Sequence, residues 1–414
     1  MMTAPARSPD TLGTTMKTAL LLSTFDENVG DDLIRHGVEH LLEQVSPGPW
    51  RYERWAKSNA ISASFAVGPL STATIHRRGG LVRMAMGRAE RASMSPFNPW
   101  RFQKLLRSDL VLVCGTPLFY FTAAQDFADA ERWPAIILHA ARTADPPPIV
   151  TLGCGSILYR SVEETRARFP RGLAVVRDVV ECQSLFVCRD RSTEQLIRAA
   201  GVPQEVPIPV LPCPSVWAAD RLGIGPAAAG RTLCISFSTE SSTWSDPGDR
   251  DVEIRVGLFA AAVAKTRSLG LEAVALAHND LDVAAVMRAK RSRTDLDGVP
   301  VVRVDAAQLL ERLRTARGLI TWRVHGAAAA RSLGIPALLF RTDSRVDLAA
   351  GLGATVVDNE SSSVGAVDAF LDAAADARPP AGEAALRALK ENAVGTLRGS
   401  WQDRVADGLR RGRT

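Results

Sequence analysis

Two side chains that can bind an anion and move a proton lie two residues apart in the second half of the chain. Arg323 and His325 sit in a turn between an apolar strand that begins near Gly318 and a helix that ends at Gly334. Ligands collect at the carboxyl ends of strands in open α/β sheets, and a helix N-terminus there favours an anion. The turn therefore indicates a site for a phosphate or carboxylate substrate. The alternative interpretation is that Arg323 pairs with a carboxylate at the sheet edge and His325 caps or packs the helix.

Two other strand ends carry the same kind of residue. Arg189 follows the apolar strand 185–188 and precedes a helix, which repeats the arrangement of a cation above a helix start. Near the N-terminus, the strand 18–24 leads into a loop that holds Asn28, Gly30 and Asp31 before a helix begins. Asp31 could be a functional residue of this loop. It could equally be a helix-capping residue, because acidic residues are common in the first turn of a helix.

Strands and helices alternate in both halves of the chain, which predicts an α/β fold with two Rossmann-like domains facing each other across a cleft. A chain of 414 residues is too long for one ordinary core. The cleft is expected to collect the strand ends, including Gly115 and His278. The predicted divisions are a disordered leader at 1–16, an N-terminal acceptor-side domain at 17–205, a linker at 206–230, a C-terminal donor-side domain at 231–375 and a helical tail at 376–414.

Composition narrows the possible functions. The chain is 46% hydrophobic and 23% charged, which is typical of a soluble globular protein. A net charge of +5 and 6% aromatic residues do not indicate nucleic-acid binding. Six cysteines without a C-x-x-C pair predict reduced thiols in a cytoplasmic protein, and no metal site is expected.

The segment 77–107 is rich in arginine and poor in acidic residues. One interpretation is peripheral contact with the inner face of a membrane, or with a diphosphate-linked lipid acceptor. The other is a solvated basic loop and helix. No stretch approaches the length of about 18 apolar residues that a membrane-spanning helix needs.

Four segments in order resemble the polysaccharide pyruvyl transferase family. Residues 28–34 are similar to its N-x-G-D loop, and 109–119 to its strand with a Gly-rich turn. Residues 188–196 resemble its R-D-x-x-S helix start. The stretch 321–326 resembles its R-x-H block, with the G-I-P and D-x-K motifs matched at 334–336 and 343–345.

The resemblance implies a fold of the glycosyltransferase-B type and phosphoenolpyruvate as donor, with no further cofactor. The product would be a pyruvate ketal on two hydroxyls of a sugar or lipid-linked glycan in a cell-envelope or exopolysaccharide precursor. By the same resemblance, phosphoenolpyruvate would contact Arg189, Arg323 and Gly326, and His325 would be catalytic. Asp31 would act as base toward the acceptor hydroxyl. The acceptor or the cleft would involve Asn28, Gly30, Gly115, His278 and Arg345.

The chain departs from the family pattern at three places. The usual Gly-Gly-Gly turn is replaced by Cys114-Gly115-Thr116-Pro117, a Ser- and Thr-rich loop stands where a basic residue is usual, and Arg345 replaces a lysine. Two alternative functions remain open. One is a nucleotide-sugar glycosyltransferase of the same fold, and the other is a catalytically inert scaffold for glycan assembly.

Overall fold

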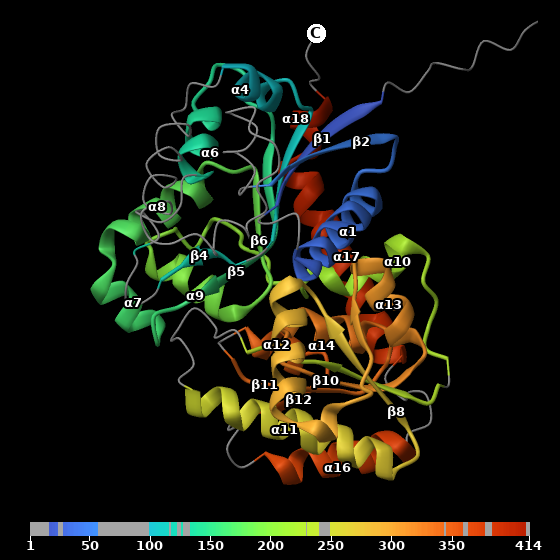
Figure 1. Cartoon of the computed structure of the whole chain (residues 1–414). Helices are drawn as coiled ribbons and strands as arrows, with labels where there is room; N and C mark the ends of the chain where they lie inside the picture. The colour runs from blue at the N-terminus through green and yellow to red at the C-terminus, as the bar shows by residue number, and fades with distance from the viewer. Residues whose placement is uncertain are drawn as a thin grey trace, which may run out of the picture.

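The structure is a computed structural model that describes residues 16–23, 28–56, 99–115, 117–121, 126, 133–228, 230–239, 249–342, 345–358, 363–376 and 383–410. Nearly all of the predicted leader, residues 77–98 of the basic segment and most of the loop at 238–248 lie outside these residues. Figure 1 shows two α/β units, one above the other, each built around its own sheet.

The first sheet has six parallel strands in the order β2-β1-β3-β5-β4, with β6 also paired to β5. The strands are β1 (Lys17–Ser23), β2 (Trp50–Ala56), β3 (Leu110–Cys114), β4 (Pro117–Tyr120), β5 (Ile149–Ile157) and β6 (Leu185–Cys188). Every residue of β3, β5 and β6 is buried, as expected for parallel strands covered on both faces.

Helices cover both faces of the first sheet. Alternate residues of β1 divide between two cores: Ala19 and Leu21 pack with α1, and Leu20 and Leu22 pack with α6, α8 and α9. The helices of this half are α1 (Val29–Val45), α4 (Pro99–Leu106), α6 (Trp133–Ala141), α7 (Val162–Arg168), α8 (Pro170–Glu181) and α9 (Arg191–Ala199).

The second sheet also has six parallel strands, in the order β12-β11-β10-β7-β8-β9. They are β7 (Thr232–Ser236), β8 (Glu272–Ala277), β9 (Val301–Arg303), β10 (Ala316–Thr321), β11 (Ala337–Phe340) and β12 (Thr355–Val357). The predicted fold class, two Rossmann-like parallel sheets, is confirmed.

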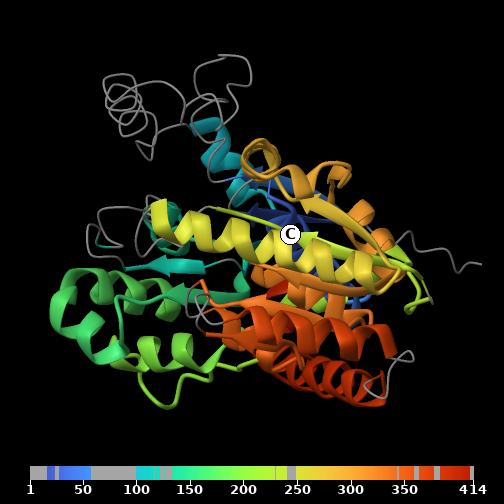
Figure 2. The same cartoon turned by 60° about the horizontal axis from the view of Figure 1, so that its bottom comes forward.

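Two groups of helices enclose the second sheet. One core is formed with α11 (Asp249–Ser268), α12 (Asp280–Ser292) and α16 (Val364–Asp376), and Figures 1 and 2 show α11 and α16 packed along the sheet. The opposite core includes α13 (Ala306–Arg314) and α14 (Val324–Ser332) and is continuous with the core under α1. The remaining elements of this half are η3 (Thr294–Leu296) and α15 (Val346–Ala350).

The segment between the sheets packs tightly on α1. It contains η2 (Pro214–Trp217) and α10 (Ala218–Leu222), within the predicted linker. A Cβ on Gly37 of α1 would lie 1.7 Å from the Pro214 carbonyl oxygen, so only glycine permits this approach. In α10, Arg221 donates to Glu39 at 3.3 Å and to Glu43 at 3.0 Å. The two halves therefore share a packed junction around α1.

The C-terminal helices return to the first half. The tail contains α17 (Glu383–Arg404) and α18 (Ala406–Arg410), and Figure 1 shows α17 beside α1. Arg398 of α17 donates to the Gln44 carbonyl at 3.2 Å, and Trp401 is buried in the core with α1. Within the described residues, every helix is too short or too polar to cross a bilayer.

Candidate anion-binding site between the two sheets

His325 and Arg189 come from different halves of the chain and meet at the junction. His325 lies in the first turn of α14, directly after β10, and Arg189 follows β6. Arg189 Nη1 lies 3.3 Å from His325 Nε2. A guanidinium is only a donor, so Nε2 accepts this hydrogen bond and the neutral ring carries its proton on Nδ1.

The Arg189 side chain is fully buried, at 0% exposure. Its backbone N donates to the Cys154 carbonyl at 2.8 Å, which fixes the start of the side chain beside β5. A Cβ on Gly155 would lie 2.4 Å from Arg189 Nε, so the guanidinium occupies space that only glycine leaves open. Nε and Nη2 have no hydrogen-bond partner among the described residues, and the Asp190 carboxylate is 3.9 Å from Nε. A buried cation with two unused donors is suited to bind an anion.

The first turn of α1 lies against the other edge of the His325 ring. The Asn28 side chain caps α1 by accepting from the Gly30 N–H at 3.0 Å. A Cβ on Gly30 would lie 2.4 Å from His325 Nδ1, so the missing side chain makes room for the imidazole. Asp31 follows at the same helix end and is buried. The N-termini of α1 and α14 thus converge on His325, and both helix dipoles favour negative charge there.

Arg323 is held by an acidic residue from a neighbouring helix. It is the N-cap residue of α14, and its Nη2 donates to Asp282 Oδ1 at 2.5 Å. The other carboxylate oxygen of Asp282 accepts from the His278 backbone N–H at 3.1 Å. His278 is itself buried, and its Nε2 has no hydrogen-bond partner among the described residues. Burial and the Arg323 charge lower the pKa of His278 to about 4, although Asp282 opposes this shift.

The charges around His325 keep its imidazole neutral. Burial is the largest cause that lowers its pKa well below the ordinary value, although part of the side chain stays exposed. Arg189, Arg345, His278 and Arg323 lower the pKa further, in that order. Arg345 precedes α15, so a third arginine contributes to the field. A bound anion would oppose these charges and favour the protonated ring.

A family model described as polysaccharide pyruvyl transferase matches residues 28–344. The chain belongs to the polysaccharide pyruvyl transferase family. The matched region begins at the cap of α1 and runs through both sheets, so it contains Arg189, Arg323 and His325. The resemblance expected from the four sequence segments is confirmed. No curated protein matches this sequence.

Solved structures extend the likeness in fold. UDP-GlcNAc 2-epimerase from Neisseria meningitidis, bound to UDP-GlcNAc, has a TM-score of 0.53 and 11% identity over 92% of this chain and 99% of that one. S. aureus MnaA in a co-structure with UDP has a TM-score of 0.52 and 13% identity, over 91% of each chain. UDP-GlcNAc 2-epimerase from Methanocaldococcus jannaschii has a TM-score of 0.51 and 14% identity, over 91% of this chain and 100% of that one. These identities bear on the fold alone, which is of the glycosyltransferase-B type.

The remaining predicted residues of this pyruvyl transferase family member lie at different places. Gly326 is in the first turn of α14, where a Cβ would lie 3.4 Å from the His278 ring. Gly115 directly follows β3 and donates its N–H to the Leu152 carbonyl at 2.8 Å. A Cβ on Gly115 would lie 1.9 Å from the Gly153 carbonyl oxygen, so its close approach is to β5. The site thus brings together Asn28, Gly30, Asp31, Arg189, His278, Arg323, His325, Gly326 and Arg345.

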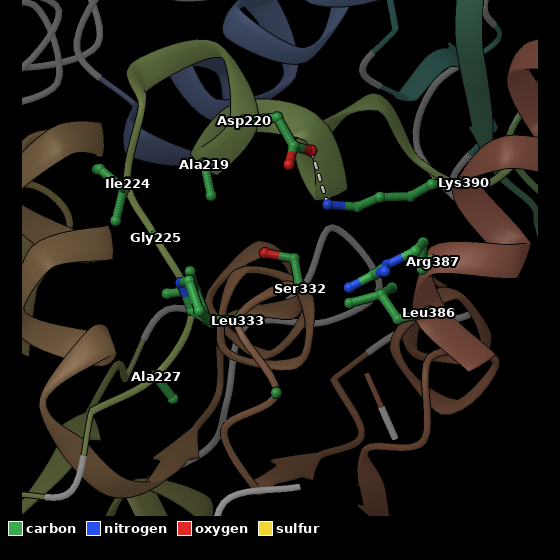
Figure 3. A pocket seen from close by; sticks show the side chains of 12 residues that line it. Ala219, Asp220, Ile224, Gly225, Ala227, Ser332, Leu333, Leu386, Arg387 and Lys390 are labelled. Carbon is green, nitrogen blue, oxygen red and sulfur yellow. Dashed lines mark hydrogen bonds and ion pairs between the residues drawn. The ribbon is translucent and has the colours of Figure 1, made fainter. Parts of the chain in front are cut away.

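A separate cavity of about 460 Å³ lies at the other end of α14, and Figure 3 shows the side chains that line it. Ser332 and Leu333 line it together with residues of α10, the following loop and α17. Lys390 enters from α17, but its ammonium is paired to Asp220 at 2.7 Å. The cavity thus lies where α10, α14 and α17 meet, at the end of α14 that is remote from His325.

The sequence did not identify the partners in two contacts of the site. Asp282 stands in the first turn of α12, where acidic residues are expected as capping groups, and Gly155 lies inside a buried strand. Their contacts with Arg323 and Arg189 are visible only in three dimensions. Among the described residues, no group of three or more His, Cys, Asp or Glu side chains could hold a metal ion.

Proposed function

We propose that this protein transfers the enolpyruvyl-derived group of phosphoenolpyruvate onto two hydroxyls of a sugar in a glycan precursor. The bond from carbon 2 to the phosphate oxygen breaks, and two carbon–oxygen bonds to the sugar form. Of the two hydroxyl protons, one balances the proton added to the methylene carbon and the other leaves with phosphate. The family match supports pyruvyl transfer, and the site residues suit this donor.

The observation that carries the proposal is the buried Arg189 guanidinium beside His325. Phosphoenolpyruvate has two anionic groups, a phosphate and a carboxylate, so more than one cation is needed to bind and orient it. Arg189 offers Nε and Nη2. Arg323 caps the same helix that carries His325, and the charges of Arg323 and Arg345 both act on the imidazole. Two helix N-termini strengthen the same field.

His325 is assigned the proton transfer to the methylene carbon. In the ligand-free site its Nε2 accepts from Arg189, so the ring has no proton to give at that atom. Binding of the anion gives the Arg189 donors a new acceptor and raises the pKa of the imidazole, so that Nε2 becomes protonated. Positioned acid catalysis of this kind contributes roughly 10²–10⁴-fold to a rate. Asp31, at the adjacent end of α1, is assigned the proton of the acceptor hydroxyl.

The test uses the full chain with phosphoenolpyruvate and a panel of sugar acceptors. We expect release of inorganic phosphate, and an acceptor mass increased by that of the donor less phosphoric acid. Phosphoenolpyruvate at 100 times its dissociation constant should also stabilise the fold by about 2.7 kcal/mol. Stabilisation by a UDP-sugar but not by phosphoenolpyruvate would instead support the glycosyltransferase alternative and contradict the proposal.

A further inference from the structure

A completely buried carboxylate, that of Asp282, is paired with Arg323, the arginine of the R-x-H block. Asp282 has 0% side-chain exposure, in the first turn of α12. Its backbone N–H is bound by the Asn279 cap at 2.8 Å, so the position of the residue is fixed. Both carboxylate oxygens have donors, one from Arg323 Nη2 at 2.5 Å and one from the His278 backbone at 3.1 Å.

The pair joins two elements that are not neighbours in the sheet. Arg323 follows β10 and Asp282 follows β8, and β7 runs between these strands. The guanidinium therefore extends across the carboxyl end of β7 to reach its partner, while 25% of the Arg323 side chain stays exposed. A buried ion pair costs desolvation and is poor evidence for stability, but it fixes the orientation of a side chain well.

We propose that Asp282 is a positioning residue, which holds the partly exposed Arg323 side chain so that its guanidinium is directed at the anionic donor. The proposal rests on the function proposed above. Asp282 does not itself touch the substrate, since its carboxylate is enclosed and acts through Arg323 and the His278 backbone.

The substitution Asp282→Asn separates positioning from electrostatics, because the two effects have opposite signs. Asparagine has nearly the same shape, but its NH₂ group must face a donor, either Arg323 Nη2 or the His278 N–H. One of the two hydrogen bonds is lost, and in either orientation the charge-assisted bond from the Arg323 guanidinium is lost or weakened. At the same time a negative charge leaves a site that contains three arginines, which by charge alone strengthens anion binding. If Asp282 positions Arg323, the substitution weakens the binding of phosphoenolpyruvate. If Asp282 acts only through its negative charge, the substitution strengthens that binding.

The experiment measures the dissociation constant and KM for phosphoenolpyruvate in the full chain. We expect Asp282→Asn to raise both by about tenfold or more, with a smaller change in kcat. The matched control is Asp280→Asn, one residue from the same cap, since Asp280 is 58% exposed and pairs with Arg303 on the surface. The control should leave both values within about twofold of the parent protein.

A double-mutant cycle with Arg323→Gln keeps the test decisive if Asp282→Asn unfolds, because the double variant contains no unpaired buried charge. In the Arg323→Gln background, Asp282→Asn should change phosphoenolpyruvate binding by less than about twofold. An equal loss in both backgrounds, or tighter binding by Asp282→Asn alone, would overturn the positioning role. Failure of the parent protein to bind phosphoenolpyruvate would instead overturn the proposed function. The same variants would then be tested with inorganic phosphate, where weaker binding by Asp282→Asn would support the positioning role and tighter binding would overturn it.

Discussion

Replacing Gly30 by alanine tests the contact between α1 and the His325 imidazole. The new Cβ would lie 2.4 Å from His325 Nδ1 and 3.0 Å from its Cγ. A carbon and a nitrogen in van der Waals contact are about 3.5 Å apart, so the ring must move by about 1 Å. Because the ring is the end of a side chain and Gly30 belongs to a capped helix, the ring moves and the helix stays.

The expected result is a large loss of activity with little loss of stability. A misplacement of about 1 Å in a catalytic group lowers a rate by about 100-fold. Removing glycine from a helix stabilises it by up to about 1 kcal/mol, which offsets part of the packing cost of about 1–3 kcal/mol. Phosphate release gives kcat, and urea unfolding gives the free energy of unfolding.

The matched control is Gly257→Ala in α11, where a Cβ would meet no atom within 4 Å. This variant should gain up to about 1 kcal/mol of stability and keep the parent activity. If Gly30→Ala keeps the parent kcat while remaining folded, then the position of His325 against α1 does not matter for catalysis, and this reasoning is refuted.

Three further outcomes follow from the burial of charged groups. Binding of phosphoenolpyruvate at pH 7.5 should be accompanied by net proton uptake, because the pKa of His325, which burial and the arginines hold low in the free site, rises beside the bound anion. Calorimetry in buffers of different ionisation heat measures this uptake, and His325→Asn should abolish it. His278 has a pKa of about 4 in the fold against 6.5 for the free side chain, so the unfolded chain binds the extra proton between these values and stability falls as pH is lowered through them. The free energy of unfolding, measured with urea, should fall by about 3 kcal/mol over this pH range. If the free energy of unfolding of His278→Gln depended on pH as steeply as that of the parent protein, this assignment would be contradicted. Glu39→Ala should cost about 3–5 kcal/mol, because this buried carboxylate accepts from Arg35, Arg54 and Arg221; the exposed Glu164, 4.0 Å from Arg160, should cost less than about 1 kcal/mol when replaced by alanine.

The local pattern of the sequence was sufficient for the fold and for the cations of the site. β10, the turn at Arg323 and the helix that ends before Gly334 are coded by neighbouring residues, since apolar runs, glycines and prolines act over a few positions. Arg189 could be linked to the same site because each sheet places its strand ends at one edge, and the cleft between the two domains was expected to collect both edges.

Contacts between distant segments could not be predicted in this way. The proline-rich segment around Pro214 has the composition of a linker, yet it packs on α1 because Gly37 has no side chain. Asp282 has the sequence context of an ordinary capping residue, and its partner Arg323 is 41 residues away. Gly37 meets Pro214 where α1 packs on the segment between the sheets, and Asp282 meets Arg323 across β7 within the second sheet. No local pattern contains either contact.

In the proposed reaction, phosphoenolpyruvate gives its three carbons to the sugar, and a solvent-exchangeable proton reaches its methylene carbon. Mass spectrometry of the acceptor after reaction with carbon-labelled phosphoenolpyruvate in deuterated water tests both parts at once. We expect a ketal that contains all three labelled carbons and one deuterium in its methyl group, and we expect no such ketal with His325→Asn. An acceptor without label, with the donor unchanged or hydrolysed to free pyruvate, would contradict the account.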